Sequence, residues 1–102
     1  MTDTAAANRE QIVERISERR YDLARLEVAA LALFGSAARG DLGPESDVDV
    51  LVQFEHRASF DRYMDLKLFL EDLLDRRVDL VTRGALKPRL HARIADELVH
   101  VA

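Results

Sequence analysis

Two short apolar runs, 28–34 and 48–54, are separated by a segment in which glycine and aspartate are concentrated. The chain has four glycines, and three of them fall between positions 35 and 43. Continuous apolar runs of this length, bounded by turn residues, indicate buried β-strands. A chain with two such runs is expected to fold around a sheet, with Gly35 ending the first strand.

Capping residues and helical periodicity account for most of the remaining chain. Asn8 followed by Gln11 resembles a capping box, Ser59 suits a helix N-cap, and Pro88 suits a first helical turn. The patterns predict helices over about 8–26, 36–40, 60–75 and from 88 onward, with further extended segments over 77–81 and 99–102. The expected fold is α/β, with helices packed against one small mixed sheet.

Length and composition favour one small soluble domain over 1–102. The 102 residues are 48% hydrophobic, which is enough to bury a single core. No apolar run approaches the length of a membrane span, no signal peptide is visible, and there is no cysteine, so a cytoplasmic protein is expected. The net charge of -4 disfavours direct binding of nucleic acid through a general basic surface.

Three aspartates carry the strongest chemical signal in the sequence. Asp47 and Asp49 are two positions apart at the start of a strand, so both side chains point to one face. Adjacent carboxylates repel each other, and a hard cation such as Mg²⁺ relieves that repulsion, although solvated aspartates beside a turn are an alternative interpretation. Asp79 lies within the third strand and can join them if that strand neighbours the second, which would form a two-metal centre for phosphoryl or nucleotidyl transfer.

The turn at Gly35 and Ser36 is a weaker signal for phosphate binding. Glycine allows the backbone to come close to a ligand, and a following helix start offers N–H groups to an anion. Glycine-serine turns are common, so an ordinary turn is the alternative. Ser36 has neither a Gly-x-Ser-x-Gly elbow nor a Walker A lysine beside it, which disfavours a serine hydrolase or a P-loop protein.

In combination, "GSAARG" followed by "SDVDVLV" resembles the nucleotidyltransferase signature of the DNA polymerase beta superfamily. The chain is more closely similar to the minimal nucleotidyltransferases, which are the antitoxin partners of HEPN-domain toxins. The resemblance extends from about Leu31 to Val101 and includes the tail "IADELVHV". It implies a polymerase-beta-like fold. It also implies a Mg²⁺-dependent transfer of AMP from ATP to a hydroxyl group of a HEPN toxin, the hydroxyl being that of a tyrosine.

The same resemblance implies roles for individual residues. Gly35 and Ser36 would hold the nucleotide triphosphate, Asp47 and Asp49 would bind two Mg²⁺ ions, and Asp79 would complete the metal site and help to deprotonate the acceptor hydroxyl. Arg39 would either neutralise phosphate charge or brace the loop against Asp41 or Asp47. An antitoxin that neutralises its toxin by binding alone, with this site unused, is the alternative function. The presence of all three aspartates argues against it.

Two surfaces are candidates for contact with a partner. The helix over 60–75 has a predicted core face and further apolar residues on both sides of it, so it exceeds what one small sheet should cover. The core-facing residues are Phe60, Tyr63, Leu66, Leu70, Leu73 and Leu74, and the flanking ones are Met64, Leu68 and Phe69. The surplus indicates either a homo- or hetero-oligomer surface or a wide core face. The basic segment 83–93 indicates a triphosphate clamp, a landing site for an acidic partner or a solvated helix face.

Overall fold

The computed structural model describes residues 5–102, and the first four residues lie outside the described part. Helices, strands and two short 3₁₀ turns follow one another closely along the chain. They are α1 (Arg9–Ser17), α2 (Arg20–Arg25), β1 (Val28–Phe34), α3 (Gly35–Arg39), β2 (Val48–Phe54), α4 (Phe60–Leu74), β3 (Val78–Thr82), η1 (Arg83–Ala85), α5 (Pro88–Ile94), η2 (Ala95–Glu97) and β4 (Val99–His100).

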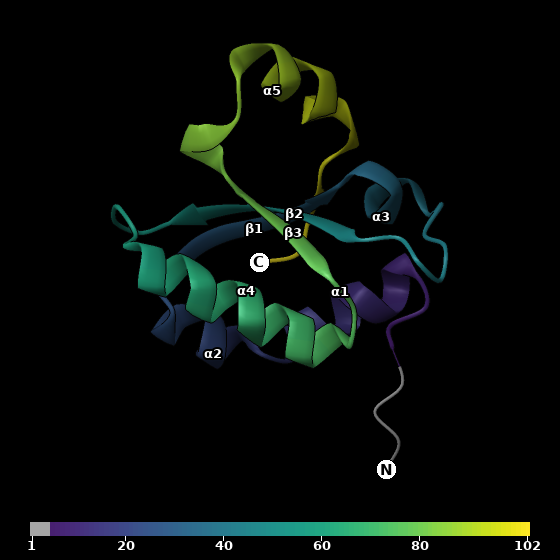
Figure 1. Ribbon diagram of the computed structural model, residues 1–102, viewed down its shortest axis with the longest axis horizontal. Coiled ribbons are helices and arrows are strands. Elements are labelled where there is room, and N and C mark those ends of the chain that lie inside the picture. The colour runs from purple at the N-terminus through teal and green to yellow at the C-terminus, as the bar shows by residue number, and fades with distance from the viewer. Residues whose placement is uncertain (1–4) are drawn as a thin grey trace.

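The strands form one mixed four-stranded sheet in the order β3-β2-β1-β4. β1 runs antiparallel to both β2 and β4, whereas β2 and β3 are parallel. The parallel pair needs a crossover connection, and α4 supplies it. This architecture confirms the α/β fold expected from the sequence (Figure 1).

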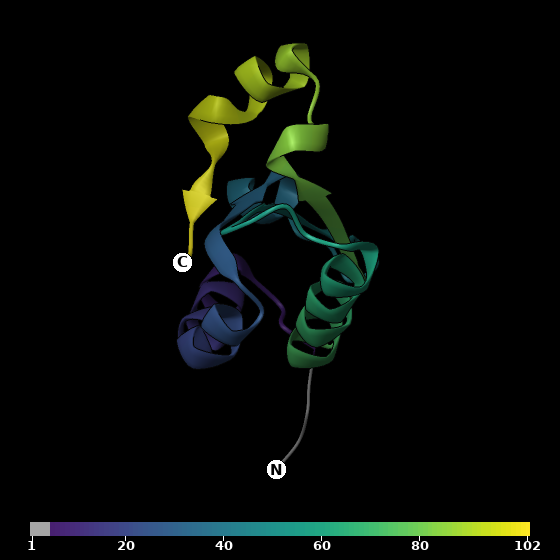
Figure 2. The same ribbon diagram turned by 90° about the vertical axis from the view of Figure 1, so that its left-hand side faces the viewer.

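The two faces of the sheet have different coverings, as Figures 1 and 2 show. Helices α1, α2 and α4 lie against one face, and the segment from η1 through α5 to η2 arches over the other. Alternation along β2 sends Val48, Val50 and Val52 into the core with the helices, where all three are fully buried. The intervening positions, which include Asp49, therefore belong to the face beneath the arch.

The arch, residues 83–98, is weakly anchored to the rest of the molecule. Among its described side chains, only Ile94 is buried. Leu90 and Leu98 follow Ile94's helical spacing in this segment, but Leu90 is 44% exposed and Leu98 lies beyond the end of α5 at Ile94. The arch is held at its ends, by β3 and β4, more than by its own packing.

The single first helix predicted over 8–26 is wrong, because α1 ends at Ser17 and α2 begins at Arg20. Asn8 caps α1 as expected, and its side chain accepts a hydrogen bond from the backbone N–H of Gln11 at 2.9 Å. The run 17–20 contains no apolar residue. No side chain there can be buried to hold the helix through this point, and the chain turns instead.

The long helix is as predicted at its start and one residue shorter at its end. Ser59 caps α4 by accepting from the N–H of Arg62, and Asp75 ends it in a left-handed conformation with φ 51°. The predicted core face of α4 is confirmed at Leu66, Leu70 and Leu74, which are fully buried.

No helix within residues 5–102 is both long enough and apolar enough to cross a bilayer.

Two apolar side chains of α4 remain in solvent. Phe60, predicted to face the core, is 75% exposed, because it lies in the first turn of α4 beside an open cavity rather than beneath the sheet. Leu68 is 57% exposed.

The bounds of the last two strands differ little from the predicted ones. β3 begins one residue later than expected, and within the predicted extended segment 99–102 only Val99–His100 forms the strand β4.

Candidate active site

The register of β1, β2 and β3 places Asp49 of β2 beside the Gly35 turn on one side and beside Asp79 on the other. In the antiparallel pair Asp49 lies opposite Phe34, the residue that precedes Gly35. In the parallel pair it lies opposite Asp79. Neighbouring strands in register present opposed side chains on the same face. The condition under which Asp79 was expected to join the other aspartates, that β3 lies beside β2, is therefore met.

The carboxyl groups of Asp49 and Asp79 lie within reach of each other. The pKa of Asp49 is raised to about 6 from an ordinary value of 3.8, first by burial and then by the negative charges of Asp79 and Asp47. A hydrogen bond between the side chains of Asp49 and Asp79 raises this pKa further, and the charge of Arg39 lowers it. Such a pair of crowded carboxylates is typical of a site that binds a cation or handles a proton.

Gly35 makes room for the Asp49 carboxylate. Its φ is +65°, and a Cβ added at this position would lie 2.3 Å from Oδ2 of Asp49. The sequence predicted a close approach of the Gly35 backbone to a ligand. In the structure the group that approaches this backbone is the side chain of Asp49. Any other residue at this position would both strain the turn and displace the carboxylate.

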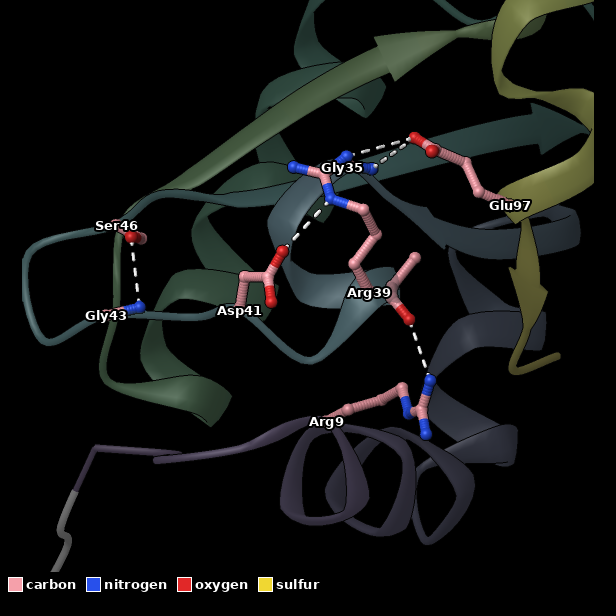
Figure 3. A network of polar contacts seen from close by, with 8 residues as sticks. Arg9, Gly35, Arg39, Asp41, Gly43, Ser46 and Glu97 are labelled. Carbon is pink, nitrogen blue, oxygen red and sulfur yellow. Dashed lines mark hydrogen bonds and ion pairs between the residues drawn. The ribbon is translucent and has the colours of Figure 1, made fainter.

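Arg39 and Gly35 converge on one acidic side chain from the arch (Figure 3). The Gly35 N–H donates to Oε1 of Glu97 at 3.2 Å, and Nη1 of Arg39 lies 3.5 Å from the same oxygen. Nε of Arg39 also donates to Oδ2 of Asp41 at 3.2 Å. Of the two roles expected for Arg39, bracing against Asp41 is present in the structure, and phosphate binding stays a prediction.

Ser36 lies beside Gly35 at the start of α3 and supports the following turn. Its carbonyl accepts hydrogen bonds from the N–H groups of Gly40 and of Asp41, the second at 2.9 Å. Arg9 of α1 reaches the other end of α3 and donates to the carbonyl of Ala38 at 2.8 Å. These bonds hold the segment that follows β1 against the rest of the protein.

Asp47 is exposed and follows a loop that an arginine holds in place. The guanidinium of Arg76 donates to the carbonyls of Gly43 and Ser46, the second at 2.8 Å, and Oγ of Ser46 accepts from the Gly43 N–H at 3.1 Å. These hydrogen bonds fix the backbone of the loop that leads into Asp47. Sequence reasoning missed Arg76, because it lies in a charged run that is typical of a solvated turn.

Asp49 and Asp79 carry carboxylate oxygens, the kind of ligand that a hard divalent cation prefers. Among the side chains that the structure describes, which do not include that of His91, no three acidic, histidine or cysteine residues are grouped so that they could hold a metal ion. Asp49 and Asp79 nevertheless supply two neighbouring carboxylates, and burial together with the negative charge of Asp79 raises the pKa of Asp49. A cation such as Mg²⁺ would replace the proton of Asp49 and relieve the repulsion between the two carboxylates.

Comparisons with known proteins show the family to which the chain belongs. Residues 9–101 match the model of the nucleotidyltransferase domain family. The chain is 40% identical over 77 residues to the protein adenylyltransferase MntA of Thermococcus cleftensis, which covers 76% of this chain and 78% of that protein. A solved structure of a candidate minimal nucleotidyltransferase superposes with a TM-score of 0.80 at 36% identity, covering 90% of this chain and 94% of the other.

A more distant structure shares the fold. It is the complex of a tri-AMPylated Shewanella oneidensis HEPN toxin with its MNT antitoxin, and the match has a TM-score of 0.66 at 19% identity over 92% of this chain and 71% of the other. The domain match covers most of the chain, and the enzymes similar to it in sequence are protein adenylyltransferases. This chain is therefore a nucleotidyltransferase of the minimal nucleotidyltransferase family, built on the DNA polymerase beta-like fold.

Proposed function

We propose that this protein is a Mg²⁺-dependent protein adenylyltransferase that transfers AMP from ATP to a tyrosine hydroxyl of a HEPN-domain toxin, and so acts as its antitoxin. The observation that carries the proposal is the Asp49–Asp79 pair, in register on adjacent strands and next to the side-chain-free backbone of Gly35. Carboxylates placed beside a backbone that can approach a ligand are what nucleotidyl transfer requires.

The reaction would form one bond and break another at the α-phosphorus of ATP. The acceptor oxygen attacks that phosphorus, the bond to the β-phosphate oxygen breaks, and pyrophosphate leaves. A tyrosine hydroxyl has a pKa of about 10 and needs help to lose its proton at neutral pH. Of the two carboxylates paired in register, Asp79 is exposed and Asp49 is partly buried, so Asp79 is the one of this pair that an acceptor from solution can reach. We therefore assign to Asp79 the role of accepting the proton of the tyrosine hydroxyl.

The remaining residues would bind and orient the nucleotide. Asp47, Asp49 and Asp79 would hold the metal, and Mg²⁺ bound there would supply positive charge to the phosphates. The backbone of Gly35 and Ser36 and the guanidinium of Arg39 would contact the triphosphate. Bonds from Arg76 to the loop before Asp47 would keep that carboxylate directed toward the nucleotide.

Two of the relatives support a protein as the acceptor. The MntA protein of Thermococcus cleftensis is named for adenylyl transfer to protein, and the Shewanella oneidensis complex joins an MNT antitoxin to an AMPylated HEPN toxin. In this chain, Phe60 and Leu68 leave apolar surface exposed on α4. We assign to that surface the contact with the toxin, or with a second copy of this chain.

The test is to incubate the purified protein with a HEPN-domain protein encoded beside it, Mg²⁺ and ATP, and to measure the intact mass of that partner. We expect a gain of one or more AMP groups on a tyrosine, and a matching loss of toxicity. Asp49→Asn should abolish the mass gain. Glu18→Gln, which also removes one negative charge but at an exposed position after α1, should leave it intact and is the control.

The binding-only antitoxin gives a different result in the same experiment. There the partner would be bound and neutralised with no gain of mass, and Asp49→Asn would protect cells as well as the wild type does. That outcome would refute the transferase proposal and favour neutralisation by contact.

A further inference from the structure

Glu97 is a residue of the arch that contacts the proposed phosphate-binding groups. It lies in η2, and its Oε1 accepts the Gly35 N–H at 3.2 Å across a separation of 62 residues in the chain. The same oxygen lies 3.5 Å from Nη1 of Arg39. One carboxylate oxygen therefore engages both a backbone donor and a guanidinium, as Figure 3 shows.

The carboxylate of Glu97 places a negative charge against Gly35 and Arg39, where a bound phosphate would also place one. Backbone N–H groups and arginine are common donors to phosphate oxygens as well as to carboxylates, and both form charge-assisted hydrogen bonds. A triphosphate that used the Gly35 N–H and Arg39 would need the positions that Glu97 now holds. The two anions cannot use these donors together without strong repulsion.

We propose that Glu97 is an internal competitor for the triphosphate, which leaves Gly35 and Arg39 when a nucleotide binds. This inference rests on the proposed function, because it takes those two groups as part of the phosphate site. The apparent affinity for the nucleotide is then lowered by the fraction of molecules in which Glu97 holds the site. Arg39 is 51% exposed and Glu97 30%, so the contact is weak enough to be displaced.

The arch is built so that Glu97 can leave at low cost. Ile94 is the only buried residue among its described side chains, so little apolar contact would be lost if η2 moved away from the sheet. Binding of the triphosphate would therefore release the end of the arch next to β4. The exposed basic residues of the arch, Lys87 and Arg89 among them, would be repositioned by the same event.

The experiment compares wild type with Glu97→Gln, which keeps the size of the side chain and removes its charge. Inorganic tripolyphosphate without metal is the first probe, and a non-hydrolysable ATP analogue with Mg²⁺ is the second. Both affinities are measured by calorimetry, and the backbone amide resonance of Gly35 is followed by NMR. We expect Glu97→Gln to bind both probes roughly three- to tenfold more tightly. The Gly35 resonance should shift in the variant alone, and shift again with either probe.

The matched control is Asp96→Asn, which removes one negative charge from the adjacent, exposed position of the same turn. It should leave both affinities within about twofold of wild type, because charge effects at exposed positions are small. Glu97→Asp, which keeps the charge but shortens the reach, should also bind tripolyphosphate more tightly, and it serves if Glu97→Gln folds poorly.

Equal affinity for tripolyphosphate in the wild type and both Glu97 variants would overturn the inference, as would weaker binding by the variants. This outcome is separate from the test of function, which depends on transfer of AMP to the partner. Tighter tripolyphosphate binding by Glu97→Gln supports the inference even if no transfer of AMP is found. Unchanged binding refutes the inference even if AMP is transferred.

Discussion

Asp49→Asn is expected to make the metal-free protein more stable at neutral pH while it lowers AMP transfer by about a thousandfold. The folded protein holds a proton on Asp49 up to a pKa of about 6, whereas the unfolded chain releases it near 3.8. The folded state therefore binds more protons between these values, and stability is lost as the pH rises from about 4 through about 6. Asparagine has no proton to lose and removes this penalty.

The size of the gain follows from the pKa. Raising the pKa of Asp49 from 3.8 to about 6 corresponds to at most ~3 kcal/mol of unfolding free energy, and since Asp49 is only partly buried we expect about 1–2 kcal/mol at pH 7. Urea unfolding of wild type and variant at pH 4 and pH 7 measures it, with the variant's advantage confined to pH 7. Equal stability of the two proteins at both pH values, or intact AMP transfer by the variant, would contradict this account of Asp49.

Gly35→Ala should reduce AMP transfer to nearly the level of Asp49→Asn. The new Cβ would lie 2.3 Å from Oδ2 of Asp49, so the carboxylate must move. The positive φ of +65° adds a conformational cost of about 1–2 kcal/mol for a residue with a side chain. We expect a measurable fall in stability and a much larger fall in the rate of transfer per folded molecule.

Gly40 provides the control that separates strain from collision. Its φ is +81°, but a Cβ there would meet no atom within 4 Å. Gly40→Ala should therefore lose a similar amount of stability and keep most of its transfer activity. Melting temperatures and initial rates of label transfer, measured on both variants, distinguish them. If Gly35→Ala transfers AMP as well as Gly40→Ala does, Gly35 is an ordinary turn residue and its contact with Asp49 has no catalytic meaning.

Much of the fold follows from local patterns in the sequence. The runs 28–34 and 48–54 are β1 and β2 at the predicted bounds, because a continuous apolar run closed by a turn has few other structures available. α4 is capped by Ser59 as predicted. The break between α1 and α2 was missed, since helical spacing resumes beyond the polar run and hides the interruption.

The candidate site was predictable where it depends on strands and unpredictable where it depends on the arch. Alternation places Asp49 on one face, and parallel pairing of β2 with β3 then brings Asp79 opposite to it. Glu97 reaches Gly35 only through the path of the arch over the sheet, which no local pattern encodes. Phe60 was assigned to the core because periodicity reports which face a residue lies on, and not whether that face is covered at the end of a helix.

The central claim is that the paired carboxylates of Asp49 and Asp79 are where a divalent cation and a nucleotide bind. Carbon-detected NMR of the aspartate carboxyl groups, titrated with acid, measures this directly. Without metal, Asp49 should titrate with a pKa of about 6. With saturating Mg²⁺ and a non-hydrolysable ATP analogue, its midpoint should fall well below that value, because the cation replaces the proton. A midpoint near the ordinary 3.8 that neither Mg²⁺ nor nucleotide moves would contradict the claim.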